Sequence, residues 1–165
     1  MVRESKSTQL QIRVSPDQKA AIERAARAAG LAMSAYVLNS LLPESSTEFR
    51  ARVAACCDPA SSRFELAELN EFLTRMPPGV LVKAVAAHPD VELTEFLDNY
   101  VAAMVEMACA RACVAPPGWT RSIMPLAAPF LGSTLKSLRL HLLTHSPVPF
   151  RRRNLFIDSS IGGQV

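Results

Sequence analysis

Apolar and polar residues alternate along a short stretch near the start of the chain. The apolar set is Leu10, Ile12 and Val14, and the polar set is Gln9, Gln11 and Arg13. An alternation with a period of two predicts a half-buried strand. Helical patterns follow it, so no neighbouring segment offers this strand a partner. Its free backbone N–H and C=O groups therefore predict pairing with a second copy of the chain, in a symmetric dimer.

Two helices are expected directly after this strand. Ser15 is placed to cap the first helix, and Gln18 completes a Ser-x-x-Gln capping box. Gly30 is the residue type that ends a helix in the left-handed conformation. Ser34 is expected to cap the second helix, which Pro43 helps to close. A segment of about 35 residues is too short to bury a stable core alone, which is a second reason to expect a dimer.

Capping residues and proline breaks predict further helices in the middle of the chain. These helices are expected to begin near residues 45, 62, 80 and 90 and to end near residues 57, 76, 88 and 114. Asp90 is expected to cap the last and longest of them. Along that helix apolar residues recur every three or four positions, at Leu93, Leu97, Tyr100, Met104 and Met107. Such a broad stripe is expected to pack against several neighbours.

The C-terminal part shows one more helical pattern, from Ser133 to His145, with Leu135, Leu138 and Leu142 expected to face inward. Residues 146–150 are expected to be extended, and residues 154–158 to form a short strand. Together these patterns predict a mainly α protein. Its domains are expected to be an N-terminal unit at residues 1–43 and a helical domain with a basic tail at residues 44–165.

The N-terminal part resembles the ribbon–helix–helix fold of the Arc and MetJ repressors. The resemblance rests on the linked strand, Ser-Pro-Asp-Gln start, alanine-rich helix, glycine turn and second helix. The spellings Ser-Pro-x-Gln-Lys from Ser15 and Met-Ser-x-Tyr-Val from Met33 are most similar to antitoxins, especially those paired with acetyltransferase toxins. The resemblance covers roughly a quarter of the chain and consists of several linked features.

This resemblance implies which residues meet DNA. In the ribbon–helix–helix fold two paired strands enter the major groove, and their outward side chains read base edges. At these positions the chain carries Gln9, Gln11 and Arg13, and the side chains suit the task, because Gln pairs with adenine and Arg with guanine. The start of the second helix, at Met33 and Ser34, is expected to offer backbone N–H groups to a phosphate.

The charge of the chain is unevenly distributed. The net charge is +3, but residues 44–115 carry six Lys and Arg against eleven Asp and Glu, whereas residues 116–165 carry six against one. An asymmetry of this kind indicates a basic surface for nucleic acid or another acidic partner. Positive charge is most concentrated at three consecutive arginines, Arg151, Arg152 and Arg153. Three interpretations stay open for these arginines: DNA phosphate contacts, contacts to an acidic partner, and pairing with the acidic middle of the chain.

Catalysis and metal binding each require particular residue patterns. The chain has no glycine-rich phosphate loop, no His-Glu-x-x-His and no Gly-x-Ser-x-Gly, so no enzymatic activity and no cofactor are expected. Two pairs of potential zinc ligands are spaced four apart, Cys109 with Cys113 and His141 with His145. These pairs lack the Cys-x-x-Cys knuckle. Without a metal, the cysteines are explained as small buried apolar residues and the histidines as residues near the C-terminus of a helix. We therefore expect no metal site.

Taken with the resemblance, these features predict a DNA-binding transcriptional repressor. It is expected to act as a homodimer, with higher-order assembly on DNA an open alternative, and to bind operator DNA, including that of its own operon. The alternative function is an antitoxin whose residues after Pro43 neutralise a co-encoded toxin, and the two roles are compatible. No segment is long and apolar enough to cross a membrane and no apolar leader is visible, so a cytoplasmic protein is expected.

Overall fold

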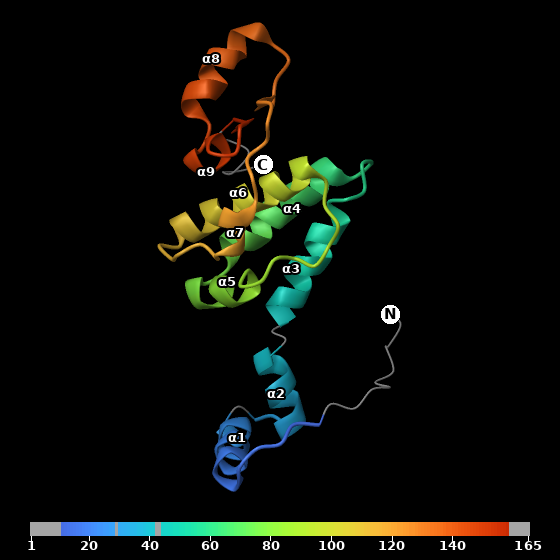
Figure 1. Ribbon diagram of the computed structural model, residues 1–165, viewed down its shortest axis with the longest axis vertical. Coiled ribbons are helices and arrows are strands. Elements are labelled where there is room, and N and C mark those ends of the chain that lie inside the picture. The colour runs from blue at the N-terminus through green and yellow to red at the C-terminus, as the bar shows by residue number, and fades with distance from the viewer. Residues whose placement is uncertain (1–10, 29, 42–43, 159–165) are drawn as a thin grey trace. The chain divides into compact units, whose positions relative to one another are not determined.

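The computed structural model describes residues 11–28, 30–41 and 44–158 (Figure 1). The chain divides into two compact units, Met1–Leu42 and Pro43–Val165. The mainly α fold class is confirmed, since helices account for most of the described residues in both units. No helix among the described residues is long and apolar enough to span a membrane.

The first unit holds two helices, α1 (Pro16–Ala28) and α2 (Met33–Leu41), which contact each other. The capping box at the start of α1 is confirmed. The backbone N–H of Gln18 donates to Ser15 Oγ at 3.2 Å, and the backbone N–H of Ser15 donates to Gln18 Oε1 at 2.9 Å. Each side chain thus satisfies a backbone donor that the helix leaves free.

The turn between the two helices forms at Gly30, as predicted. Gly30 has a φ of +67° and donates to the Arg27 carbonyl, while Leu31 donates to the Ala26 carbonyl. This tight turn brings Ala32 to the cap position, where its carbonyl accepts from Tyr36 N–H at 2.9 Å. The prediction that Ser34 caps α2 is therefore wrong, because the helix begins at Met33 and Ser34 lies in its first turn.

The second unit is built around α6 (Glu95–Arg111), the longest helix described. Before it come α3 (Glu44–Ala55), α4 (Ser62–Arg75) and α5 (Pro78–Ala84), and after it α7 (Trp119–Ser122), α8 (Lys136–His145) and α9 (Val148–Arg151). Four of them, α4, α5, α7 and α9, contact α6 (Figure 1). The predicted broad stripe is confirmed, since α6 buries eleven of its residues, among them Val101 and Val105.

Two short parallel strands complete this unit, β1 (Phe130–Leu131) and β2 (Leu155–Phe156), with Phe130 opposite Leu155. The strand predicted within residues 154–158 is confirmed. Just before it, Ser146 is buried, and its Oγ lies 2.6 Å from the Leu142 carbonyl and 2.7 Å from the Ile157 carbonyl. This contact fastens the end of α8 to the segment after β2.

Several local predictions for the second unit need correction. Thr94, and not Asp90, caps α6, because its Oγ1 accepts from Leu97 N–H at 3.3 Å. The segment expected to be extended contains α9, whose start is favoured by Pro147 and Pro149. In the α8 region Leu142 is buried, as predicted, but Leu135 and Leu138 are 60% and 41% exposed.

Candidate nucleic-acid interface

The segment that leads into α1 presents the predicted base-reading residues. Gln11 and Arg13 are exposed, whereas Gln9 lies outside the described residues. Residues 11–15 belong to no helix or strand of this chain. The described segment is held at its C-terminal end by the capping box at Ser15. Its polar side chains therefore extend into solvent from an anchored point.

The apolar side chains of the same segment are exposed as well. Ile12 is 58% exposed and Val14 is 44% exposed, against the half-buried strand face that the alternation predicts. Leu31, Met33 and Leu38 are also exposed, and among the side chains of α1 and α2 that the structure describes one is buried, Ala26. Within a single copy of the chain, this unit leaves an apolar surface uncovered.

The start of α2 is open to solvent. Met33 is 40% exposed and Ser34 is exposed too. The backbone N–H groups in the first turn of a helix have no acceptor in the helix, and the helix dipole makes this end favourable for an anion. Exposed Lys19, Arg24 and Arg27 on α1 add positive charge to the same unit. The unit thus has the chemistry for phosphate contacts at the predicted place.

The three consecutive arginines of the tail do not act alike. Arg151 and Arg152 are exposed, but Arg153 is 5% exposed. The Arg153 guanidinium lies 2.7 Å from Glu106 Oε1, donates to the Thr120 carbonyl, and lies 3.4 Å from Asn99 Oδ1. For Arg153, pairing with the acidic middle is therefore the interpretation that the structure shows. The other two interpretations, a DNA phosphate contact and an external partner contact, do not hold for Arg153, because Glu106 and the Thr120 carbonyl already engage its guanidinium inside the unit.

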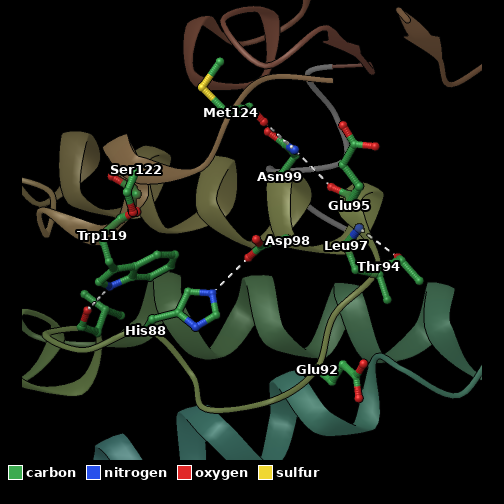
Figure 2. A network of polar contacts seen from close by, with 12 residues as sticks. His88, Glu92, Thr94, Glu95, Leu97, Asp98, Asn99, Trp119, Ser122 and Met124 are labelled. Carbon is green, nitrogen blue, oxygen red and sulfur yellow. Dashed lines mark hydrogen bonds and ion pairs between the residues drawn. The ribbon is translucent and has the colours of Figure 1, made fainter. Parts of the chain in front are cut away.

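Asn99 extends the same buried network across α6. It is fully buried, and its Nδ2 donates to the Glu95 carbonyl and to the Met124 carbonyl, each at 3.0 Å (Figure 2). Its Oδ1 faces Arg153. Nothing in the sequence pattern distinguished Asn99, because an Asn inside an apolar stripe reads as an interruption. Its partners Met124 and Arg153 lie 25 and 54 residues away and are adjacent to it only after folding.

His88 has a contact that its place beside a proline did not suggest. Its Nε2 lies 3.0 Å from Asp98 Oδ1, and its ring meets the Trp119 ring edge-on at 5.1 Å (Figure 2). The indole N–H of Trp119 donates to the Val85 carbonyl at 2.8 Å. His88 thus joins the segment after α5 to α6 and α7, which is a structural task.

The four cysteines are free thiols. Cys56 and Cys109 are buried, and burial raises the pKa of the Cys56 thiol to about 11 and raises that of Cys109 as well. The other candidate ligands, His141 and His145, stack on each other with ring centroids 4.2 Å apart. Among the described residues, no three His, Cys, Asp or Glu side chains gather in a way that holds a metal ion.

Comparison with known proteins adds one finding. Residues 4–50 match a family of NikA-like proteins, described as mobilization protein NikA. No curated protein and no solved structure matches the chain. The likeness to mobilization proteins covers the predicted base-reading residues, α1, α2 and the start of α3, and it leaves the rest of the second unit unmatched.

Proposed function

We propose that the chain is a dimeric DNA-binding protein that recognises a specific site with its first unit. The observation that carries this proposal is the match of residues 4–50 to mobilization proteins. The match includes most of the first unit, Met1–Leu42, whose described side chains bury little apolar surface. Mobilization concerns DNA that moves between cells, so a DNA-binding unit is the part such proteins are expected to share.

The exposed apolar side chains support the dimer. Ile12 and Val14 lie on one side of the extended segment, and a second copy that pairs with this segment brings four such side chains together. Backbone pairing of the two segments also satisfies the free N–H and C=O groups of residues 11–14. A two-stranded ribbon covered by four helices is the ribbon–helix–helix arrangement that we propose.

In this dimer the polar side chains of the ribbon face away from the apolar ones. Gln9, Gln11 and Arg13 from each copy then supply six groups that recognise base edges in the major groove. The first turn of α2, at Met33 and Ser34, binds a backbone phosphate on each side and sets the register. Because the two copies are related by two-fold symmetry, one dimer prefers palindromic DNA, and a repeated site accommodates more than one dimer.

Two biological roles suit a DNA-binding dimer of this kind. Repression of its own operon is the role implied by the resemblance to the Arc and MetJ repressors. Recognition of a DNA site during mobilization is the role favoured by the family match. The preferred DNA separates them, because a repressor binds a promoter and a mobilization protein binds the region from which transfer starts.

The antitoxin function is a second proposal, and exposed leucines favour it. Leu140 and Leu143 on one face of α8 are 72% and 45% exposed, beside the exposed Lys136 and Arg139. A face of this composition fits an acidic protein partner with an apolar contact surface. Such a partner would dock on a folded helix, whereas antitoxins of the resembling kind usually wrap their toxin with a flexible tail.

The test is DNA binding by the full chain and by two charge-matched variants. We expect Arg13→Ala to weaken binding to the preferred site about 10-fold or more, because a bidentate Arg–guanine contact contributes roughly 1–3 kcal/mol. Arg75→Ala removes the same charge from an exposed position on α4 and should leave the affinity unchanged. Fluorescence anisotropy with fragments of the upstream promoter and of neighbouring intergenic DNA measures both. Equal affinity of Arg13→Ala and the unmodified chain would contradict the proposal.

A further inference from the structure

A cavity of about 670 Å³ opens in the second unit. One of its sides is a face of α4, where Arg63, Leu66, Ala67 and Asn70 follow at helical spacing. The other sides come from α6, β1 and the segments around α9 and β2. The volume falls within the range of small-molecule sites and is far larger than the voids left in a packed core.

Four aromatic rings form a continuous wall along this cavity. Phe96 lies with its ring centroid 4.7 Å from that of Phe130 and 5.6 Å from that of Tyr100, and Tyr100 meets Phe150 edge-on at 5.2 Å. Met104 and Met107 add flexible, polarisable side chains beside the rings. Aromatic rings prefer offset or edge-on contact with other rings, so this wall favours a ligand that carries one.

Tyr100 places one polar group in these apolar surroundings. The residue is 7% exposed, and its hydroxyl has no hydrogen-bond partner among the described residues. Burial raises the pKa of Tyr100 to about 12, so the hydroxyl is neutral and can donate at neutral pH. The hydroxyl oxygen is not fully enclosed, and Tyr100 lines this cavity, so solvent can reach the hydroxyl there. A ligand that displaces this solvent has to supply an acceptor in its place, because a donor left buried without one is unfavourable.

The charges at the cavity are balanced. Arg63 contributes one positive charge and Asp158 one negative charge, and the remaining polar residues are neutral. Asp158 is already engaged, with its Oδ2 3.8 Å from His141 Nε2. A charged ligand would therefore gain little from the site and would lose its hydration in an apolar cavity. This balance favours an uncharged ligand.

We propose that the cavity binds a small uncharged molecule with an aromatic ring and one hydrogen-bond acceptor, such as a carbonyl oxygen. The ring packs against the wall of Phe96, Phe130 and Phe150, and the acceptor receives the hydrogen bond of the Tyr100 hydroxyl. This assigns the second unit a ligand-binding site that is independent of DNA recognition by the first unit.

The test uses the full chain and Nile red, an uncharged aromatic dye with a carbonyl group whose fluorescence rises in apolar surroundings. We expect saturable binding of one dye per chain. Ala67→Trp fills the cavity from the α4 side and should weaken binding more than 10-fold. Ala54→Trp, at an exposed position of α3 outside the cavity, is the matched control and should have no effect. Tyr100→Phe removes only the hydroxyl and should weaken binding about 5-fold, whereas Tyr36→Phe should not.

Three results would overturn the proposal. Unchanged binding in Ala67→Trp would place the dye elsewhere, and loss of binding in Leu140→Ser would place it on the exposed leucines of α8. Binding that appears only after removal of residues 159–165 would show that the chain itself occupies the cavity. Circular dichroism checks that each variant folds. Should Ala67→Trp not fold, the comparison of Tyr100→Phe with Tyr36→Phe still decides the question.

Discussion

The two units of this chain begin from similar local signals and reach different ends. In the first unit a complete capping box and a glycine turn define α1, yet Ala26 is the one buried residue among the side chains of α1 and α2 that the structure describes. In the second unit α6 is the one helix from α4 to α9 with a side-chain cap at its start, but a continuous core runs from Phe49 to Ile157. Helix formation and core formation are thus separate requirements. The first unit has strong local helix signals, and the second unit has the core.

This difference has a thermodynamic consequence. The second unit buries its own apolar surface, so its stability is a property of one chain. The proposed function makes the first unit depend on a second copy, and its stability then rises with protein concentration by mass action. Variants that destabilise one unit and spare the other test whether the two units are stabilised independently.

Removal of the buried arginine should unfold the second unit selectively. In Arg153→Ala the partly buried Glu106 and the buried Asn99 lose their partner, and breaking a buried pair of this kind costs about 3–5 kcal/mol. Arg152→Ala, one position earlier and exposed, should change the stability by less than about 0.5 kcal/mol. Denaturant unfolding measures both. An equal and small effect of the two variants would show that the internal ion pair contributes nothing.

Two leucines on α8 should differ although they are two residues apart. Leu142 is 4% exposed, and Leu142→Ala is expected to destabilise the second unit by about 2–3 kcal/mol through lost burial and a residual cavity. Leu140 is 72% exposed, so Leu140→Ala should change stability by less than about 0.5 kcal/mol. Labelling of the buried Cys56 and Cys109 thiols measures opening of this unit. Comparable labelling rates in the two variants would contradict the assignment of Leu142 as the packed face.

Loss of the cap at Ser15 should affect the first unit alone and least of all. Ser15→Ala removes one acceptor of the capping box and is expected to cost about 1 kcal/mol. Ser15→Asp keeps an acceptor oxygen and should restore most of this loss. We expect the thermal unfolding transition of the first unit to shift to a lower temperature in Ser15→Ala. The labelling rates of Cys56 and Cys109 should stay unchanged. Faster labelling in Ser15→Ala would show that the two units unfold together.

Some features were predictable from a few adjacent residues. The capping box at Ser15, the turn at Gly30 and the short strand before Asp158 all formed where expected. Helix starts were less accurate: α6 is capped by Thr94 and not by Asp90, four residues earlier. For the candidate interface, Gln11 and Arg13 are exposed as a DNA-reading role requires, and that role stays a prediction.

Other features had no sequence signal because their partners are distant along the chain. Three consecutive arginines look equivalent, yet Arg153 is buried against Glu106, 47 residues earlier. Leu138 and Leu142 share a helical face, but Leu142 is covered and Leu138 is largely open. The unpartnered Tyr100 hydroxyl and the cavity beside it arise from segments between residues 59 and 158.

The amino-acid order alone therefore determined some of the local geometry of this protein: how α1 is capped, where the chain turns at Gly30, and which polar residues precede the first helix. These depend on backbone groups a few residues apart, and a short segment carries all the interacting parts. Tertiary structure decided which arginine, which leucines and which tyrosine are enclosed. Burial depends on surfaces that meet only after folding, and no local pattern contains both sides of such a contact.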